Sequence, residues 1–288
     1  MQGSAQALRV DSRRALQRYR HLRDDRWAIP ILRAGPGGFA ERIGDSLGRT
    51  HPIVVFLAVI LAGFAAIAGL SIAVGLLVTR VLVHAWGLGG ADERVEVWLT
   101  HHRAPTWTDA SLIGSIMAGG VVLPVLAGTI MVVCLALRKW RIAAFVVFVL
   151  AVESASYRAT TLVVHRDRPR VPRLEHLPVN ESYPSGHTAA AIAVYGGLVL
   201  LLTSLVKNRI FRVLAWTIAV AIPIFVAVSR MYRGMHHPLD VAGGVLVGIA
   251  ALIVLVFACR VAGATAESRR EEENERRVPV EATGGGSR

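Results

Sequence analysis

Cysteine and acidic residues are scarce in this sequence, and their scarcity excludes several classes of protein. The chain has 288 residues but only two cysteines, Cys134 and Cys259, and both lie inside apolar runs. No disulfide framework is therefore expected, and both are predicted to be small buried side chains. Basic residues outnumber acidic ones, 32 to 20. The excess sits in short clusters instead of covering a soluble domain, which argues against a nucleic-acid-binding face.

Long apolar runs are what the sequence has in abundance. Hydrophobic residues make up 53% of the chain, and the mean hydropathy is +0.50. A membrane-spanning helix needs about 20 consecutive apolar residues. Six runs approach or exceed this length: residues 53–83, 111–137, 142–164, 188–206, 213–231 and 239–259. A soluble core would have to bury all six, so the sequence predicts an all-α integral membrane bundle of six helices.

The charges between these runs predict the topology and the division of the chain. Residues 1–50 are rich in arginine, and the loops at 138–141 and 207–212 are basic, whereas the loop at about 84–110 is acidic. Because cytoplasmic loops carry an excess of Lys and Arg, we expect a multi-pass plasma-membrane protein with both termini in the cytoplasm. The loops at 84–110, 165–187 and 232–238 then lie outside.

Three parts of the chain follow from this pattern. Residues 1–50 are predicted to be a basic cytoplasmic tail, in which residues 11–27 form either an amphipathic helix on the membrane or a solvated segment. Residues 51–262 form the six-helix domain, and residues 263–288 a disordered cytoplasmic tail. No cleavable signal peptide is expected, because the first segment lacks an early apolar core.

A short motif, Pro184-Ser185-Gly186-His187, opens the fourth predicted helix. The unpaired N–H groups at a helix start favour phosphate, and Gly186 lets the backbone approach a ligand closely. Ser185 can donate its hydroxyl to a phosphoryl oxygen or simply cap the helix. His187 titrates near neutral pH and can therefore protonate a leaving oxygen.

A second motif joins the fifth and sixth predicted helices. It reads Ser229-Arg230, then five residues to His236, then three to Asp240. A carboxylate on one imidazole nitrogen fixes the tautomer and frees the other nitrogen as a nucleophile. The alternatives are a favourable charge at a helix start for Asp240 and an interfacial polar side chain for His236. The neighbouring His237 is expected to face elsewhere, and no second cluster of ligands nearby indicates a metal.

Arginines add positive charge on the same predicted face. Arg166 and Arg168-Pro169 follow the third predicted helix, and Arg230 closes the fifth. A guanidinium group can bind phosphate through two parallel hydrogen bonds. Arginines at a membrane surface can instead extend toward the lipid head groups, and we prefer this interpretation for Arg170 and Arg173. Since these groups lie at the ends of apolar segments, the sequence indicates a lipid that carries phosphate.

The two motifs resemble two of the three signatures of the type-2 phosphatidic acid phosphatase family, which is itself similar to bacterial acid phosphatases and vanadium haloperoxidases. The resemblance covers about residues 50–260. The remaining family signature is Lys-x6-Arg-Pro, and here Thr161 stands at the lysine position before Arg168-Pro169. Arg158 lies about one helical turn earlier on roughly the same face and could replace the lysine; Arg166 is a second candidate.

The resemblance implies a role for each matching residue. His236 would be the nucleophile that forms a phosphohistidine, Asp240 would orient it, and His187 would be the general acid. The phosphoryl oxygens would be held by Arg168, Ser185, Gly186 and Arg230, with Arg158 or Thr161 at the lysine position. No metal or other cofactor is implied.

The expected activity is hydrolysis of a lipid phosphate or diphosphate, with the active site at the outer ends of helices 3–6. An outward site fits a bacterial polyprenyl (undecaprenyl) diphosphatase. Phosphatidic acid and phosphatidylglycerol phosphate are alternative substrates, and a lipid phosphotransferase would use the same residues. A non-catalytic lipid-binding or transport protein is the alternative of another class, with Glu153 and Arg158 as its intramembrane site. The sequence leaves the oligomeric state open.

Overall fold

Helices form all the regular structure in the described part of the chain. The structure is a computed structural model and describes residues 29–176 and 181–277. In chain order the elements are η1 (Pro30–Leu32), α2 (Phe39–Ser46), α3 (Pro52–Leu76), η2 (Leu77–Ala85), α4 (Gly89–His101), α5 (Pro105–Met117), α6 (Val122–Ala136), α7 (Trp140–Thr161), α8 (Gly186–Ala191), η3 (Ile192–Gly196), α9 (Gly197–Leu205), α10 (Arg209–Tyr232) and α11 (Pro238–Arg277). Proline at the first turn of α3, α5 and α11 suits a helix start, where its missing N–H costs no hydrogen bond.

Five helical segments in the described residues are long and apolar enough to cross a membrane: 52–85, 140–161, 186–205, 209–232 and 238–276. The pair α5 and α6 adds a sixth if it counts as one span. The all-α prediction is therefore confirmed for the described residues, as is a chain with several candidate membrane spans.

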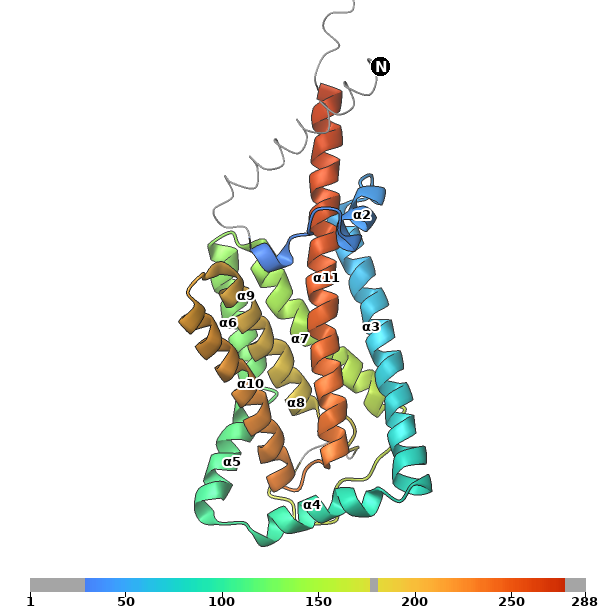
Figure 1. Cartoon of the computed structure of the whole chain (residues 1–288), viewed down its shortest axis with the longest axis vertical. Coiled ribbons are helices and arrows are strands. Elements are labelled where there is room, and N and C mark those ends of the chain that lie inside the picture. Colours follow the sequence, from blue (N-terminus) through green and yellow to red (C-terminus); the bar gives the residue numbers. More distant parts are fainter. Residues whose placement is uncertain (1–28, 177–180, 278–288) are drawn as a thin grey trace, which may run out of the picture.

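The second predicted run is broken. Residues 111–137 were expected as one helix, but α5 and α6 are bent by 43° across residues 118–121. Gly119 and Gly120 lie in this break, and glycine disfavours a helix by about 1 kcal/mol relative to alanine. Beyond this break α5 lies at the end of the bundle where α4 is found (Figure 1).

The core of the bundle forms around α11. This helix packs against α2, α3, α7 and α8, and Phe145, Val149 and Leu255 are fully buried between them. The start of α8 comes very close to α11, because a Cβ atom at Gly244 would lie 2.4 Å from the Ser185 carbonyl oxygen. Only glycine permits this approach, which brings the two sequence motifs to the same end of the bundle.

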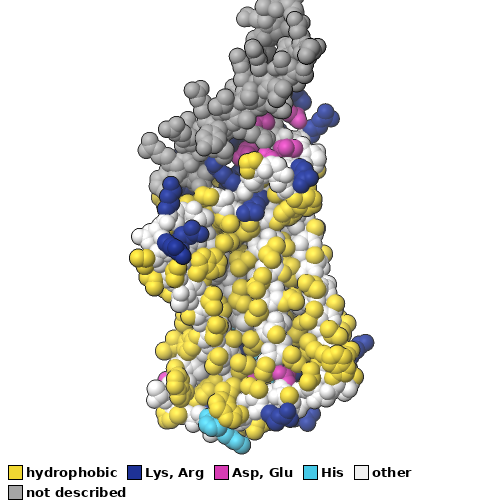
Figure 2. All heavy atoms as spheres, in the orientation of Figure 1, with side chains coloured by type: hydrophobic (Ala, Val, Ile, Leu, Met, Phe, Trp, Pro, Cys, Tyr) yellow, Lys and Arg dark blue, Asp and Glu magenta, His cyan; other side chains and the backbone are white. Residues whose placement is uncertain are grey.

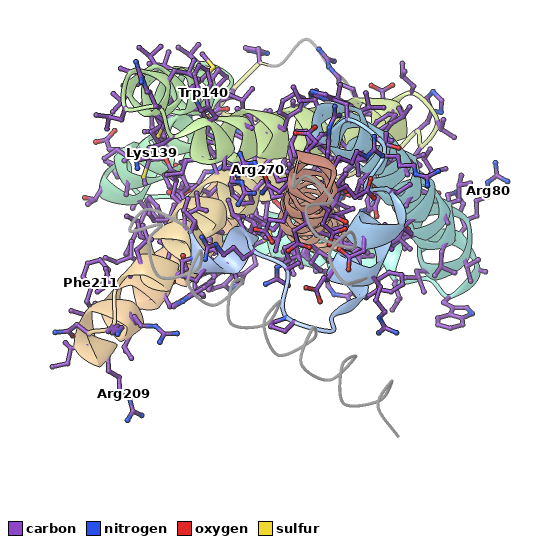
Figure 3. The ribbon with its side chains drawn as sticks, turned by 90° about the horizontal axis from the view of Figure 1, so that it is seen from above. Arg80, Lys139, Trp140, Arg209, Phe211 and Arg270 are labelled. Carbon is purple, nitrogen blue, oxygen red and sulfur yellow. The ribbon has the colours of Figure 1, made fainter. Side chains whose placement is uncertain are left out.

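The outward surface of the bundle is apolar over most of its height. Figure 2 shows hydrophobic side chains along the middle of the molecule, with charged side chains mainly toward its ends. Seen along the long axis, Arg209 and Phe211 at the start of α10 point away from the other helices (Figure 3). Leu61, Val125 and Ile218 are each more than half exposed on membrane-crossing segments, as expected for helices that face lipid.

The two ends of the bundle differ in what they hold. We call the end with α4, the end of α10 and the start of α11 the site end, and the opposite end, with α2 and the last turns of α11, the tail end (Figure 1). The predicted motif residues lie at the site end.

Three predicted irregular segments contain helices. Residues 29–50, expected as part of a tail, include η1 and α2, and α2 packs on α11 with Gly44 against Ala264. Residues 84–110, expected as a loop, contain α4 and the start of α5. The disorder expected from residue 263 is wrong through Arg277, because α11 continues with i,i+4 pairs of opposite charge such as Arg269 with Glu273. The amphipathic helix considered for residues 11–27 lies outside the described residues.

Candidate active site

Four segments converge at the site end and bring the predicted residues together. The segment after α7 carries Arg166 and Arg168, the start of α8 carries His187, the end of α10 carries Arg230, and the connection to α11 carries His236. A main-chain hydrogen bond joins the two motifs directly, from the Ser185 N–H to the Asp240 carbonyl oxygen at 2.9 Å. The two motifs are therefore adjacent in the structure, although more than 50 residues separate Ser185 from Asp240 in the sequence.

A glycine turn sets the direction of the segment that carries His236. Gly234 has φ +71°, a conformation that side chains other than glycine rarely adopt, and it reverses the chain between α10 and α11. His236 follows this turn with its side chain 3% exposed. Its Nδ1 lies 2.8 Å from the Ser182 carbonyl oxygen. Because a carbonyl only accepts, Nδ1 carries the proton, and Nε2 has the free lone pair.

Asp240 does not orient His236 by a direct hydrogen bond. Its Oδ2 lies 4.0 Å from His236 Nδ1, beyond hydrogen-bond length, and the predicted orienting contact comes from the Ser182 carbonyl instead. Asp240 is fully buried and contacts the residues next to His236 in the structure or the chain. Its Oδ2 accepts from the Ser182 hydroxyl and, at 2.8 Å, from the main-chain N–H of His237.

Arg166 joins the buried Asp240 to α4. One guanidinium nitrogen pairs with Asp240 Oδ1 and the other with Asp92 Oδ2, and all three side chains are at most 8% exposed. The Asp92 Oδ1 in turn accepts from the main-chain N–H of Leu239 at 3.2 Å. Arg166 was the second candidate to replace the missing lysine. Its guanidinium group is instead occupied by these two carboxylates.

His237 bridges two carboxylates. Its Nδ1 lies 3.2 Å from Asp240 Oδ2 and its Nε2 lies 3.0 Å from Glu93 Oε2. Burial by itself lowers the pKa of His237, but the hydrogen bond to Asp240 and the charge of that carboxylate outweigh burial and raise the pKa. Carboxylates accept from both nitrogens, so the ring is favoured as the imidazolium and ties α4 to the start of α11.

The pKa of His236 moves in the opposite direction. Burial first, and then the positive charge of Arg230, hold the pKa of His236 well below its usual range. The ring is therefore neutral near pH 7. A neutral imidazole with Nδ1 protonated and Nε2 free has the protonation state that a nucleophile requires.

Arg230 lies fully buried beside an acidic partner from the segment after α7. Its Nη1 donates to Glu175 Oε2 at 2.5 Å and also to the Ser115 hydroxyl. Glu175 pairs with Arg233 as well. Burial opposes ionisation of Glu175, but the charges of Arg230 and Arg233 outweigh it and lower the pKa to about 2.

Two donors of Arg230 are left over. Within the described residues, its Nε and Nη2 are buried and have no hydrogen-bond partner. Arginine stays charged in proteins, and a buried donor without an acceptor is costly. An anion that accepts from Nε and Nη2 would remove this cost, and a phosphate oxygen suits the guanidinium fork.

The remaining predicted residues lie around Arg230. Arg168 is 6% exposed and donates to the Met235 carbonyl oxygen at 2.5 Å. His187 lies in the first turn of α8, where Arg230, Glu175 and Arg168 act on it electrostatically. The hydroxyl of Ser185 is buried and shares a hydrogen bond with the Thr188 hydroxyl at 3.0 Å. Gly186 begins α8 directly before His187.

The position that carries lysine in the resembled family is buried. Thr161 is 6% exposed, and its hydroxyl donates to the carbonyl oxygen of Arg158 at 2.9 Å. The side chain of Arg158 is exposed. The replacement of the lysine by Arg158 remains a prediction.

A buried carboxyl group lies beside the network in α4. Glu96 is 1% exposed, and neither of its carboxyl oxygens has a hydrogen-bond partner in the described residues. Burial, together with the negative charges of Asp240, Asp92 and Glu93, raises its pKa to about 9. Glu96 is therefore protonated near pH 7.

Asp92, Asp240 and Glu175 pair with arginines, and Glu93 pairs with His237. Over residues 29–176 and 181–277, no three His, Cys, Asp or Glu side chains are placed so that they could hold a metal ion. The cations that the site offers to an anion are guanidinium groups.

Sequence reasoning missed several members of this site. Asp92 and Glu93 were visible only as charges in a loop, and their partners Arg166 and His237 are more than 70 residues away. Glu175 carried no motif. Ser182 contributes a main-chain carbonyl, which side-chain patterns do not reveal. The one available signal for α4 was the pair of acidic residues at 92 and 93, since carboxylates are favoured near the start of a helix.

Comparisons with known proteins match the part of the chain that carries the site. Residues 142–262 match the family model described as PAP2 superfamily. An undecaprenyl-diphosphatase of Sulfolobus acidocaldarius is 41% identical over 75 residues, which are 26% of this chain and 32% of that protein. Human sphingosine-1-phosphate phosphatase 2 is 40% identical over 90 residues, 31% of this chain and 22% of that protein. The chain thus spans a third or less of these curated relatives.

One solved structure has a similar fold over a larger part of the chain. It is the crystal structure of a transmembrane PAP2 type phosphatidylglycerolphosphate phosphatase from Bacillus subtilis, with a TM-score of 0.53 and 22% sequence identity. The match covers 80% of this chain and 99% of that chain. At this identity the likeness shows a shared membrane fold.

Proposed function

The chain carries a PAP2 superfamily domain over residues 142–262, and on this premise we propose that it is a membrane lipid phosphatase that works through a phosphohistidine at His236. The arrangement of His236 and Arg230 carries the proposal. His236 is buried and neutral, its Nδ1 is fixed by the Ser182 carbonyl, and Arg230 beside it has two buried donors without partners.

The chemistry requires two steps. In the first, His236 Nε2 attacks the terminal phosphorus, and the bond from that phosphorus to the oxygen that stays with the lipid breaks. This oxygen is the ester oxygen of a monophosphate or the bridging oxygen of a diphosphate, and protonated His187 gives its proton to it. In the second, water attacks the phosphohistidine, His187 takes a proton from the water, and phosphate leaves with His236 restored. Splitting the transfer in this way replaces one difficult step by two easier ones.

The arginines lower the barrier by charge. The transferred phosphoryl group carries negative charge on its outer oxygens, and preorganised donors stabilise it in a site that excludes water. In our proposal Arg230 uses Nε and Nη2 for this purpose, and Arg168, Ser185 and the N–H groups at Gly186 surround the other oxygens. No metal takes part.

Asp240 acts as a positioning residue in this mechanism. It holds the Ser182 hydroxyl and the His237 main chain, and Ser182 in turn holds His236. Its negative charge also favours the positive imidazole that forms as His236 becomes phosphorylated.

For the substrate we propose a polyprenyl diphosphate, in line with the name of the Sulfolobus relative. Phosphatidic acid, phosphatidylglycerol phosphate and sphingosine phosphate form the second class of candidates, and the names of the human relative and of the Bacillus structure support this class. All are amphiphiles that carry a terminal phosphate at the polar end of a lipid.

For the topology we propose six spans, with α5 and α6 counted as one, over a membrane domain of residues 51–262. The tail end then faces the cytoplasm, because the connection from α6 to α7 and the start of α10 lie toward that end (Figure 1) and are basic. The basic residues are Arg138, Lys139, Arg209 and Arg212. The site end faces outward from the plasma membrane, where a lipid phosphate of the outer leaflet reaches it.

Phosphate release by the detergent-purified protein tests the proposal. EDTA is present throughout, and a polyprenyl diphosphate and a phosphatidic acid are offered separately, with His236→Ala as the control. Release from either lipid that disappears in the variant supports the phosphatase, and the faster substrate decides the class. No release from either lipid, or release that survives His236→Ala, contradicts it. Loss of release in Arg158→Ala, restored by adding Thr161→Lys, would support Arg158 as the substitute for the missing lysine.

A further inference from the structure

A narrow groove opens between α4, α5 and α10 at the site end. Its volume is about 280 Å³. Its walls are mainly apolar and aromatic, with Trp98 from α4, Trp107 and Ala110 from α5, and Phe225 and Val228 from α10. None of these residues belongs to either sequence motif, and the mechanism proposed above does not use them.

The inner end of the groove is polar and adjoins the phosphate-binding arginines. Ser111 and Ser229 both line it. The Ser111 hydroxyl accepts from Arg233 Nη1 at 3.1 Å, and Arg233 shares Glu175 with Arg230. Ser229 directly precedes Arg230 in the chain. The groove thus runs from an apolar mouth to the cationic centre of the site.

The mouth of the groove has the composition of a membrane interface. Trp98 and Trp107 are each more than half exposed, and indole rings concentrate at the boundary between hydrocarbon and head groups. The Trp98 ring stacks on His102 with their centroids 4.3 Å apart, so this wall is preorganised. α5 and α10 belong to membrane-crossing segments, whereas α4 does not.

We propose that this groove binds the first part of the hydrocarbon chain of the lipid phosphate, the part next to the phosphate that Arg230 and His236 receive. The inference rests on the proposed phosphatase function and names the site for the substrate's apolar portion. The groove lies near the lower limit of about 300–1,000 Å³ for small-molecule pockets. It therefore takes only the chain's first segment, and the rest of the chain remains in the bilayer.

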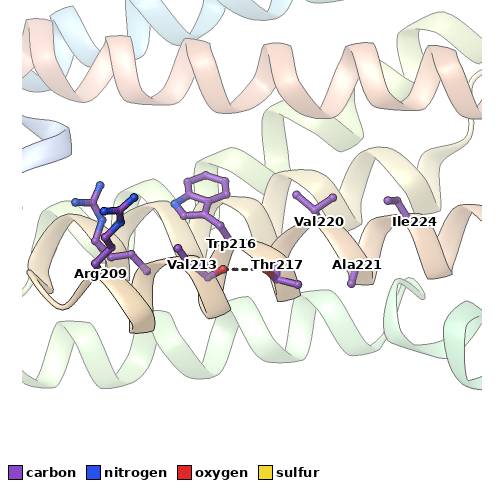
Figure 4. A pocket seen from close by; sticks show the side chains of 8 residues that line it. Arg209, Val213, Trp216, Thr217, Val220, Ala221 and Ile224 are labelled. Atoms are coloured by element: carbon purple, nitrogen blue, oxygen red, sulfur yellow. Dashed lines mark hydrogen bonds between the residues drawn. The ribbon is translucent and has the colours of Figure 1, made fainter.

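A larger groove shows why volume alone does not identify this site. About 950 Å³ in size, it runs along the outward face of α10 from Arg209 past Trp216 to Ile224, and only residues of α10 line it (Figure 4). It contains no residue of the site and has no polar end near Arg230. The smaller groove is distinguished by its continuity with the site.

A bulky side chain in the groove tests the proposal. Ala110→Phe places a bulky ring in the groove, and Ala66→Phe is the control, because Ala66 is exposed on α3 and lines neither groove. Two substrates are compared: the better of farnesyl diphosphate and phosphatidic acid, and p-nitrophenyl phosphate, which has no hydrocarbon chain. Filling an apolar subsite is expected to raise KM for the lipid about tenfold.

The pattern across substrates decides the outcome. The proposal requires that Ala110→Phe leave kcat/KM for p-nitrophenyl phosphate within about twofold of wild type while KM for the lipid rises. Equal losses on both substrates would mean that the substitution disturbs the chemistry, and no loss on either would mean that the chain binds elsewhere. Both results overturn the proposal.

Cross-linking separates this inference from the proposed function. A lipid phosphate with a diazirine near the start of its chain is photolysed with His236→Ala protein, which needs no turnover. Labelling of peptides from α4, α5 and the end of α10, reduced by Ala110→Phe but not by Ala66→Phe, supports the groove even if the wild type releases no phosphate. Labelling confined to other helices overturns it even if the wild type is active.

Discussion

The two ends of α11 hold acidic residues in opposite surroundings. At the site end Asp240 is completely buried and is held by Arg166, Ser182 and His237. At the tail end the side chain of Glu273 is 54% exposed and pairs with Arg269 of the same helix at 3.1 Å. Both carboxylates belong to α11, yet only Asp240 pairs with a residue from a distant segment of the chain.

This comparison distinguishes a buried carboxylate that positions other residues from an exposed one that faces solvent. Burying charges costs more than their attraction returns unless the geometry is good and every group is bonded, so a buried network of this kind indicates a task beyond stability. An exposed pair within one helix contributes little. The four substitutions below test this comparison, from the largest expected effect to the smallest.

Asp240→Asn is expected to have the largest effect. It removes the charge that Arg166 and His237 face, and breaking a buried pair costs about 3–5 kcal/mol of stability. Because the Ser182 segment that holds His236 loses its anchor, kcat for lipid phosphate should fall about 100-fold or more. Phosphate release and thermal unfolding in detergent measure the two effects. A variant with wild-type kcat would remove Asp240 from the mechanism.

Asp92→Asn tests whether α4 positions the site from a distance. Asp92 touches no proposed substrate atom but holds Arg166 and the main chain of Leu239. We expect kcat to fall about tenfold with KM little changed, because the nucleophile is misplaced while phosphate binding is retained. The matched control is Arg94→Ala, an exposed charge on the same helix. Equal effects of the two variants would show that α4 acts only as a scaffold.

Much of the candidate site could be proposed from the sequence because its signals are local. Gly186 and His187 at a helix start, and His236 and Asp240 four residues apart, are recognisable from spacing alone, and the apolar runs gave the helices that carry them. The α4 helix was not predictable in this way, because residues 89–101 have no apolar run. Its partners Arg166 and His237 are distant in the sequence, so only the folded chain reveals the contacts.

Two errors have other physical origins. The orienting contact to His236 comes from the Ser182 carbonyl, a main-chain group present in every residue, so no pattern of side chains could reveal it. The tail after residue 263 looked disordered because it is polar on all sides. The spacing of Arg269 and Glu273 could have indicated a continued helix.

Glu96→Gln is expected to stabilise the protein at alkaline pH. The pKa of Glu96 is about 9 in the folded protein and near 4.5 when exposed. Between these values the folded state binds more protons than the unfolded state, so stability is fully present below pH 4.5 and falls as pH rises toward 9. The neutral amide lacks this dependence. Its Tm should exceed that of the wild type by about 3 °C or more at pH 8, with a smaller difference at pH 5.

A constant difference in Tm between pH 5 and pH 8 would contradict this assignment. It would mean that Gln changes packing and that the ionisation of Glu96 plays no part. Gln and Glu are nearly identical in shape, so the substitution changes mainly the ability to ionise.

Glu273→Gln is expected to have the smallest effect. Exposed i,i+4 pairs contribute about 0.3–0.5 kcal/mol, so Tm should change by about 1 °C or less and phosphate release should be unchanged. A large loss of activity in this variant would show that the tail end takes part in function and would remove the contrast between the two ends.

Direct detection of the phosphoenzyme tests the central claim. The wild-type protein is mixed rapidly with a lipid phosphate in EDTA, quenched during turnover in alkali, where phosphohistidine survives, and digested for mass spectrometry. We predict phosphate on Nε2 of His236, absent from the matching sample of His236→Ala. Lipid phosphate hydrolysis by the wild type without any phosphorylated His236, or phosphate found on another residue, would contradict the proposed mechanism.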